Sequence, residues 1–393
     1  MTELNVALER YRAWLEDPSI DEETKRELRE LEGREQEIAD RFYRELEFGT
    51  GGLRGVMGAG LNRMNAYTVG KATQGLANWL LARREKPSVV IAHDSRRSSD
   101  AFALTAAEVL AGNGIRAYLW PSLRPTPQLS FTVRHLGADA GVVITASHNP
   151  PEYNGYKVYG PDGCQIVPDL AAEVIARIRE VGSFAEVKRM PRAEAEAAGL
   201  IVWLGEREDR AYHETVAAQC LRPELIKSGA GNELSIIYTP LHGAGNVPVR
   251  EVLKLAGFGN VRVVAEQERP DGNFPTVKSP NPEEREAFTL AIEQAKREGA
   301  DLIIGTDPDC DRVGAVVKDD RGEYIVLNGN QTGAILVHYL LTALHEQGRL
   351  PANGAVIKTI VTGEMGADIA RSFGVRVDNT LTGFKYIGER MTR

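Results

Sequence analysis

Short apolar runs alternate with helix-like segments from Pro87 onward, and this alternation limits the possible fold more than any other feature of the chain. The runs at 89–92 (VVIA) and 141–145 (GVVIT) lack the polar–apolar alternation of a strand with one face in water. Strands of this kind are buried on both faces, as in a sheet covered by helices on either side. A helix is expected between them, from Asp100 to Ala111. The sequence therefore predicts an α/β fold.

The alternation recurs twice more, after an Ala- and Glu-rich stretch at 182–230 that is expected to be a helical connector. In the second block a helix is expected from Asn281, as its cap, to Lys296, because Pro282 and Glu284 follow in the order typical of a helix start. A strand at 324–327 is expected to open the third block. We predict three tandem α/β domains, each a mixed sheet with helices on both faces, and the third incomplete. Their expected ranges are 1–200, with N-terminal helices and a serine loop; 201–305, leading into an acidic loop; and 306–393.

Composition excludes several classes of protein. The chain has 393 residues and a formal net charge of 47 − 55 = −8, which argues against a general nucleic-acid binder. No apolar run approaches the ~20 residues that span a bilayer, and the acidic start does not resemble a signal peptide. The three cysteines are far apart and form no CxxC pair. A cytoplasmic monomer with no nucleic-acid or membrane partner is expected.

Ser147 lies in a polar loop, TASHNP, directly after the apolar strand at 141–145. In open α/β sheets, ligands bind beyond the carboxyl ends of strands, so this hydroxyl is a candidate nucleophile. His148 and Asn149 add hydrogen-bonding groups beside it. No GxSxG elbow surrounds the serine, which argues against hydrolase chemistry of the α/β type. An ordinary polar turn is the alternative.

Asp307, Asp309 and Asp311 alternate in a loop that follows the strand expected at 301–305. Carboxylates at alternate positions can turn their oxygens toward one point, which suits a hard divalent cation such as Mg²⁺. An EF-hand is excluded because Arg312 stands where that loop requires glycine. A solvated acidic turn is the alternative.

Several cationic residues stand near glycines or strand ends. The segment Gly49–Gly55 is expected to be a loop whose backbone N–H groups approach an anion, with Arg54 as a forked phosphate ligand. Lys157, Lys358 and Lys385 are isolated lysines that could act as acids or bases near phosphate. A flexible loop and surface lysines are the alternatives. His242, in TPLHGAGN, is expected to stabilise a loop, with a role in the functional site as the alternative.

Four motifs together resemble the α-D-phosphohexomutase superfamily, in particular its phosphoglucomutase/phosphomannomutase branch. They are FGTGGLRG at 48–55, TASHNPPEYNGYK at 145–157, GTDPDCDR at 305–312 and TGFK at 382–385. The resemblance extends over nearly the whole chain. It implies an isomerase of carbohydrate metabolism that interconverts hexose 1-phosphate and 6-phosphate, glucose most of all, through a phosphoserine and a bisphosphate intermediate.

The resemblance also implies roles for individual residues. Ser147 would carry the phosphoryl group and, with Asp307, Asp309 and Asp311, hold Mg²⁺; glucose 1,6-bisphosphate would act as activator. The other catalytic positions would be Arg54, His148, Lys157 and, for proton transfer, Lys385. Substrate contacts would come from Arg312, Lys358, Thr382 and Gly383. The only partners implied are small sugar phosphates.

The chain departs from the family pattern after TGFK. The sugar-selecting loop and the phosphate-binding fourth domain are missing, and Gly363-Glu364-Met365 precedes TGFK, so it is out of order for the sugar loop. A truncated form, active or inactive, is therefore expected. Phosphomannomutase or phosphopentomutase specificity stays open, as does a non-catalytic phosphosugar-binding fragment. A phosphatase with Asp307 as nucleophile is a further alternative, although it leaves TASHNP unexplained.

Overall fold

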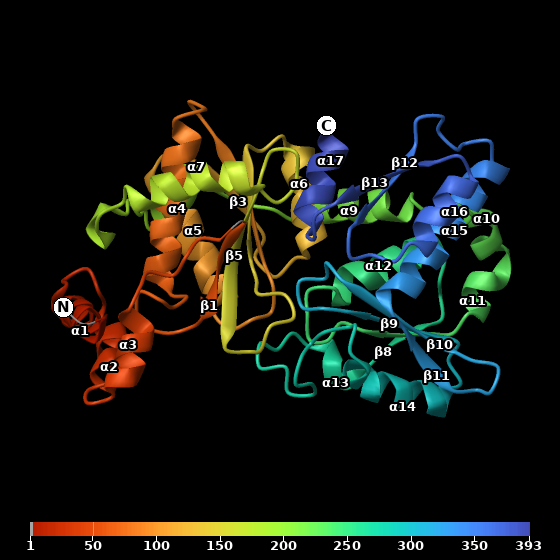
Figure 1. Cartoon of the computed structure of the whole chain (residues 1–393), viewed down its shortest axis with the longest axis horizontal. Coiled ribbons are helices and arrows are strands. Elements are labelled where there is room, and N and C mark those ends of the chain that lie inside the picture. Colours follow the sequence, from red (N-terminus) through yellow and green to blue (C-terminus); the bar gives the residue numbers. More distant parts are fainter. Residues whose placement is uncertain (1–2, 50) are drawn as a thin grey trace. The chain divides into compact units, whose positions relative to one another are not determined.

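The computed structural model describes residues 3–49 and 51–393, which form two compact units, Met1–Leu204 and Gly205–Arg393 (Figure 1). Thr50 of the glycine-rich segment lies outside the described residues. The helices of the first unit are α1 (Glu3–Glu16), α2 (Glu22–Arg29), α3 (Glu35–Phe42), α4 (Ala66–Leu81), α5 (Ser99–Gly112), α6 (Thr126–Leu136), α7 (Pro168–Arg179) and α8 (Arg192–Ala197). Its strands are β1 (Gly52–Val56), β2 (Ser88–His93), β3 (Arg116–Leu119), β4 (Ala140–Ile144), β5 (Tyr153–Tyr159) and β6 (Ile201–Trp203).

The six strands of the first unit form one mixed sheet in the order β1-β5-β4-β2-β3-β6. Strands β4, β2, β3 and β6 are parallel, whereas β5 runs antiparallel to both β4 and β1. The expectation of a mixed sheet is confirmed. The parallel strands place the loops that follow β2 and β4 at the same edge of the sheet.

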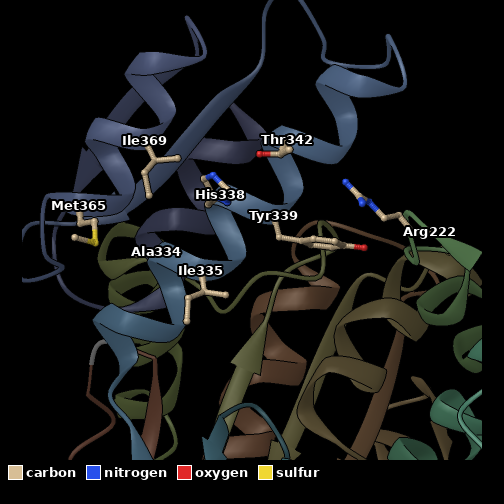
Figure 2. A pocket seen from close by; sticks show the side chains of 8 residues that line it. All are labelled: Arg222, Ala334, Ile335, His338, Tyr339, Thr342, Met365 and Ile369. Atoms are coloured by element: carbon tan, nitrogen blue, oxygen red, sulfur yellow. The ribbon is translucent and has the colours of Figure 1, made fainter. Parts of the chain in front are cut away.

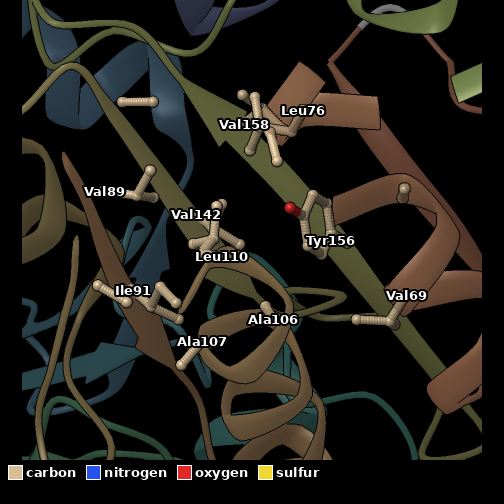
Figure 3. Packing of buried hydrophobic residues seen from close by; sticks show 14 of the residues in the cluster. Val69, Leu76, Val89, Ile91, Ala106, Ala107, Leu110, Val142, Tyr156 and Val158 are labelled. Carbon is tan, nitrogen blue, oxygen red and sulfur yellow. The ribbon is translucent and has the colours of Figure 1, made fainter. Parts of the chain in front are cut away.

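Both faces of this sheet are buried, as the apolar runs predict. Val89 and Ile91 of β2 pack in a cluster with residues of α4 and α5 (Figure 3), whereas the intervening Val90 packs with Leu129 and Val133 of α6. Successive side chains of a strand point to opposite faces, so one apolar run supplies both clusters. Helices α1 to α3 form a separate cluster around Trp14.

Two sequence expectations for this unit are wrong. The glycine-rich segment is not wholly a loop, because β1 begins at Gly52 and pairs with β5. A Cβ atom on Gly52 would lie 1.9 Å from the carbonyl oxygen of Tyr156, so this glycine permits close strand pairing rather than flexibility. The stretch at 182–230 is not purely helical either, since β6 pairs with β3 at the sheet edge.

The second unit contains two further sheets. Its helices are α9 (Glu206–Ala217), α10 (Pro223–Leu225), α11 (Gly231–Glu233), α12 (Asn246–Ala256), α13 (Ala265–Glu268), α14 (Thr289–Glu298), α15 (Gly329–Glu346), α16 (Met365–Ser372) and α17 (Phe384–Thr392). Its strands are β7 (Ile236–Thr239), β8 (Val261–Val263), β9 (Leu302–Thr306), β10 (Val313–Lys318), β11 (Tyr324–Leu327), β12 (Ala355–Thr359) and β13 (Arg376–Thr380).

The larger sheet has the order β11-β10-β9-β7-β8; β7, β8 and β9 are parallel, and β10 runs antiparallel to both of its neighbours, β9 and β11. Ile237, Ile303 and Val316 of this sheet pack against α14. The smaller sheet joins β12 and β13 in parallel, and α15 and α16 pack together beside it. The strand at 324–327, expected to open the third block, is β11 of the larger sheet.

The helix expected from Asn281 to Lys296 begins later than the sequence predicts. Residues 281–284 form a turn, Arg285–Phe288 a 3₁₀ turn, and α14 starts at Thr289. A Cβ atom on Gly314 would lie 2.0 Å from the carbonyl oxygen of Pro282, so the turn lies directly against β10. This tertiary contact overrides the local helix-start signal.

Within the described ranges of both units, no helix combines the length and the apolar character needed to cross a bilayer.

Candidate functional site

The acidic loop follows β9 in the second unit and gathers three carboxylates. Asp307, Asp309 and Asp311 each offer one oxygen, and these oxygens lie within 4.8 Å of one another. Asp307 and Asp309 are fully buried, whereas Asp311 is exposed. Buried carboxylates this close repel one another, and a cation among them relieves the repulsion. An all-oxygen donor set fits a hard divalent cation such as Mg²⁺.

Local backbone geometry turns this loop sharply. Cys310 has φ 55°, in the left-handed region, and its N–H donates to the carbonyl oxygen of Asp307 at 2.9 Å. The N–H of Arg312 donates to Oδ1 of the Asp307 carboxylate at 3.0 Å. Burial, and then the charges of the neighbouring aspartates, raise the pKa of the Cys310 thiol to about 12. The thiol is therefore protonated at neutral pH.

A second loop, Pro240–Gly245 after β7, supports the acidic loop. The N–H of Ala244 donates to the carbonyl oxygen of Pro308 at 2.8 Å, and a Cβ on Gly243 would lie 2.5 Å from Cα of Pro308. Because Pro308 stands between two of the aspartates, this contact fixes the carboxylates against β7. The loop belongs to the TPLHGAGN motif, whose glycines are the sequence signal for such a close approach.

His242 holds the supporting loop in place. Its Nδ1 lies 3.1 Å from the carbonyl oxygen of Arg269, and its Nε2 lies 2.8 Å from Oγ1 of Thr276. The carbonyl can only accept, so Nδ1 carries the proton and Nε2 accepts from the threonine. Burial lowers the pKa of this imidazole below its ordinary value. The expected loop-stabilising role of His242 is confirmed.

In the first unit, Ser147 lies three residues beyond the end of β4, in a strained turn of the loop at 145–150, here called the serine loop. Its φ is 52°, and its N–H donates to Oγ1 of Thr145 at 2.8 Å. The Ser147 hydroxyl lies 3.2 Å from Nδ1 of His148. A non-glycine residue in the left-handed region at a strand end is a common feature of functional sites.

Strands β1 and β5 carry two of the expected cationic residues. Arg54 pairs with Gly155 and Lys157 pairs with Gly52, so the two side chains share one face of this strand pair. Nη1 of Arg54 lies 3.4 Å from Oδ1 of Asn149, in the serine loop. Within this unit the fold therefore brings Arg54, His148 and Ser147 together.

The remaining candidates belong to the second unit. Arg312 pairs with Glu283 at 3.0 Å. Lys358, at the end of β12, is buried, pairs with Glu364 at 2.7 Å and donates to the carbonyl oxygen of Thr362 at 3.0 Å. Its charge is thus engaged inside the fold, with a partner six residues along the chain.

Thr382, Gly383 and Lys385 stand at the start of α17. Gly383 has φ 124° and precedes the helix as its cap. Burial lowers the pKa of the Lys385 ammonium, which lies 5.2 Å from the ring centroid of Tyr386. A lysine with a lowered pKa exchanges protons more readily near neutral pH.

An apolar groove between α15 and α16 is separate from these residues (Figure 2). It is lined mainly by Ile335, His338 and Tyr339 of α15 and by Met365 and Ile369 of α16. None of the site candidates among the described residues lines it.

Comparison with known proteins gives matches along most of the chain. Models of the phosphoglucomutase/phosphomannomutase family match in chain order: α/β/α domain I at residues 45–184, domain II at 210–322 and domain III at 328–393. A phosphoglucomutase of Staphylococcus haemolyticus (strain JCSC1435) is 42% identical over 350 residues, which are 88% of this chain and 62% of the relative. One of Staphylococcus aureus (strain N315) is 38% identical over 353 residues, 89% of this chain and 61% of the relative.

Solved structures give the same result for the fold. A Thermus thermophilus protein assigned as a phosphomannomutase superposes with a TM-score of 0.72 at 27% identity, over 88% of this chain and 71% of that one. A phosphoglucomutase/phosphomannomutase family protein of Burkholderia thailandensis superposes with a TM-score of 0.67 at 22% identity, over 88% of this chain and 68% of that one. The chain spans about three-fifths of the length of the curated relatives it matches.

Proposed function

Because the chain belongs to the phosphoglucomutase/phosphomannomutase family, we propose that it acts as a phosphoglucomutase-type phosphotransferase. The proposed reaction interconverts glucose 1-phosphate and glucose 6-phosphate through a phosphorylated Ser147 and a glucose 1,6-bisphosphate intermediate. The observation that carries the proposal is the position of the Ser147 hydroxyl, in a strained turn beyond a parallel strand, with Arg54 close to the same loop.

In the first proposed step, the Oγ–P bond of phosphorylated Ser147 breaks as a P–O bond forms to the free hydroxyl of the hexose monophosphate. That hydroxyl loses its proton, and Lys385 in its neutral form is the proposed acceptor, which its lowered pKa supports. In the second step the other phosphate ester of the bisphosphate breaks, and that phosphoryl group returns to Oγ of Ser147. In the first step the departing Oγ of Ser147 takes up a proton and becomes a hydroxyl. In the second step that hydroxyl gives up its proton as it accepts the phosphoryl group, and the sugar oxygen that is released takes up a proton, so charge and atoms balance.

Charge balance explains the other proposed site residues. A phosphoserine adds a charge of roughly −1.5 to −2. We propose that Arg54, His148 and Lys157 offset this charge as hydrogen-bond donors, and that Arg312, Lys358, Thr382 and Gly383 contact the substrate. The guanidinium of Arg54 is suited to phosphate because its forked N–H groups bind two oxygens at once.

Asp307, Asp309 and Asp311 are the proposed ligands of Mg²⁺, with an oxygen of the phosphorylated Ser147 as a further ligand. The three clustered oxygens support this assignment. When bound, the ion would neutralise phosphate charge and draw electron density from phosphorus. We propose that the serine loop and the acidic loop serve the same phosphoryl transfer. A cytoplasmic location is proposed too, because Cys164, Cys220 and Cys310 form no disulfide.

A two-stage assay tests the proposal. Wild-type protein is first incubated with Mg²⁺ and glucose 1,6-bisphosphate labelled on phosphate, and labelled peptides are mapped; label on Ser147 is expected, and none in Ser147→Ala. Glucose 1-phosphate with a trace of bisphosphate is then supplied, and glucose 6-phosphate is measured through its dehydrogenase. Label on Asp307, or release of inorganic phosphate without isomerisation, contradicts the proposal.

Sugar preference is measured in the same incubation, with the product (the 6-phosphate of a hexose or the 5-phosphate of ribose) separated and quantified by anion-exchange chromatography, because the dehydrogenase detects only glucose 6-phosphate. Mannose 1-phosphate and ribose 1-phosphate replace glucose 1-phosphate at equal concentration. The 42% identity to a phosphoglucomutase favours glucose, whereas the 27% identity to the Thermus protein motivates the mannose arm. A higher kcat/KM for mannose 1-phosphate would assign phosphomannomutase specificity instead.

A further inference from the structure

A buried arginine in the first unit lies beneath the serine loop. Arg96 belongs to the turn between β2 and α5, and its side chain has no exposed surface. Its guanidinium donates to the carbonyl oxygens of Ser147 at 2.6 Å, Pro150 at 2.8 Å and Tyr153 at 3.0 Å. It also donates to the carbonyl oxygen of Asn149. One side chain therefore ties together most of the backbone from Ser147 to Tyr153.

Asp94 links this arginine to the amide of Ser147. Its Oδ2 lies 3.5 Å from Nε of Arg96 and accepts from Oγ1 of Thr145 at 2.6 Å. Thr145 Oγ1 in turn accepts from the N–H of Ser147. The other carboxylate oxygen accepts from the N–H of Arg96 at 2.9 Å and from Oγ of Ser99 at 2.8 Å. Asp94 is also fully buried, so the pair is an enclosed ion pair with several hydrogen bonds.

This arrangement suits an arginine and no other residue. A guanidinium offers five N–H donors in a fixed plane and stays charged at every accessible pH. Convergent carbonyl dipoles would repel one another without a cation among them. A lysine at the same place has three donors on a single atom, so it cannot reach carbonyls spread over the same width.

The contacts also account for the backbone conformation of Ser147. A serine in the left-handed region persists only where its surroundings over-determine it. Here the N–H of Ser147 is held by Thr145 and its carbonyl by Arg96, so both sides of the residue are fixed. The direction of the Cα–Cβ bond of Ser147, which carries the hydroxyl, is thereby set before any ligand binds.

We propose that Arg96 and Asp94 form the positioning pair of the serine loop: they hold Ser147 in its left-handed conformation and so aim its hydroxyl for phosphoryl transfer. The part of the inference that concerns transfer rests on the proposed function. Arg96 acts through the backbone of the loop, and its charge is offset by Asp94. It is a positioning residue, distinct from the residues proposed to bind phosphate.

The test compares Arg96→Lys with Arg41→Lys in the full chain. Arg41 is the matched control: it is also mostly buried in the first unit, where it pairs with Glu27 at 2.6 Å and Glu37 at 2.8 Å, but it belongs to α3. Two quantities are measured for each protein. The first is hydrogen exchange of the peptide 145–153, and the second is the single-turnover rate of Ser147 labelling from glucose 1,6-bisphosphate.

In Arg96→Lys we expect faster exchange of the peptide 145–153 and labelling slowed by about 100-fold, because misplacement of a reacting group by about 1 Å costs that much. The bisphosphate concentration for half-maximal rate should stay within a few-fold of wild type, since no proposed phosphate ligand is removed. Arg41→Lys should lower the melting temperature without changing the exchange of 145–153 or the labelling rate. In Arg96→Ala, millimolar guanidinium should restore part of the labelling rate, and the same addition should leave Arg41→Ala unchanged.

Thr145→Val carries the same test if Arg96→Lys does not fold, because it removes only the hydroxyl that joins Asp94 to the N–H of Ser147. If either variant folds and shows the same hydrogen exchange of the peptide 145–153 and the same Ser147 labelling rate as wild type, the inference is overturned. If wild-type protein takes no label, the proposed function fails. Hydrogen exchange of 145–153 still decides whether Arg96 holds the loop, so the two failures are distinguishable.

Discussion

At the scale of single residues, the strongest prediction concerns Asp309. Replacing it with alanine removes one of three clustered carboxylates, two of which are fully buried. Without divalent cations, Asp309→Ala should melt at the same or a higher temperature than wild type, because repulsion between carboxylates is relieved. We expect Mg²⁺ to raise the melting temperature of wild type, and this rise should be absent in Asp309→Ala. Scanning fluorimetry with and without Mg²⁺, and calorimetric titration with Mg²⁺, measure both effects.

Asp320→Asn is the control for Asp309→Ala. Asp320 is exposed and lies between β10 and β11, so the variant loses the same charge from the same sheet at a distance from the acidic loop. Its response to Mg²⁺ should equal that of wild type. A Mg²⁺ response that survives in Asp309→Ala would refute the ligand assignment.

His242 makes a prediction about pH. Burial lowers the pKa of its imidazole in the folded state below the ordinary 6.5. Above that value both folded and unfolded chains hold it neutral. As the pH falls below it, the unfolded chain takes up the proton first, so stability is lost on acidification. His242→Gln should cost about 1 kcal/mol near neutral pH, through the lost hydrogen bonds, and should lose less stability on going to about pH 5.5.

Urea denaturation of wild type and His242→Gln at about pH 7.5 and about pH 5.5 checks this. His345→Gln, which changes a surface imidazole at the end of α15, serves as the control. If wild type and His242→Gln lose the same free energy of unfolding between the two pH values, the imidazole of His242 has the same pKa in the folded and unfolded chains, and the prediction is wrong.

At the scale of elements, the buried strands could be predicted from sequence because their apolar runs need no tertiary information. The positions of the serine loop and the acidic loop could be predicted too, because each loop directly follows such a strand. The start of α14 could not be predicted: the signal at Asn281 is local, and the contact between Pro282 and Gly314 that overrides it joins distant positions. Gly52 was predicted to lie in a loop but lies in a strand, because in sequence a glycine that permits close strand pairing cannot be told from a loop glycine.

The loop Pro240–Gly245 makes a prediction at this scale. In Gly243→Ala, the new methyl group would meet Cα and the carbonyl oxygen of Pro308 at 2.5 and 2.7 Å, and backbone atoms cannot turn aside as a side chain can. The free energy of unfolding of this variant should be about 1–3 kcal/mol lower than that of wild type. It should also bind Mg²⁺ more weakly, because a displaced Pro308 moves the aspartates on either side of it.

Gly333→Ala is the matched control. It lies in α15, where a Cβ atom would meet nothing within 4 Å, so the substitution should raise the free energy of unfolding by roughly 0.5–1 kcal/mol. Urea denaturation and Mg²⁺ titration are run on both variants. Undiminished Mg²⁺ affinity in a destabilised Gly243→Ala would show that the two loops are not coupled.

At the scale of the whole molecule, sequence reasoning had no access to Arg96. Arg96 belongs to the segment Asp-Ser-Arg-Arg at 94–97, which in sequence is typical of a polar turn before a helix. The carbonyl groups that it binds lie 51 to 57 residues further along the chain. Only the parallel pairing of β2 with β4 places this turn under the serine loop. A motif identifies a reactive side chain, whereas the fold identifies the residues that position it.

The last prediction asks whether the serine loop and the acidic loop act in one reaction. Arg96 and Asp309 belong to different compact units. The stability changes of Arg96→Lys and Asp309→Ala should therefore add in the double variant, to within about 0.5 kcal/mol.

The labelling rate of Ser147 should behave differently. If both loops serve one phosphoryl transfer, a mispositioned serine gains less from the cation, and the double variant should be less impaired than the product of the two single losses. Single-turnover labelling of the four proteins completes this cycle, with Arg41→Lys combined with Asp309→Ala as the control pair. If the double variant instead loses a factor equal to the product of the two single losses, the two loops act independently. The acidic loop would then have no part in the proposed reaction step.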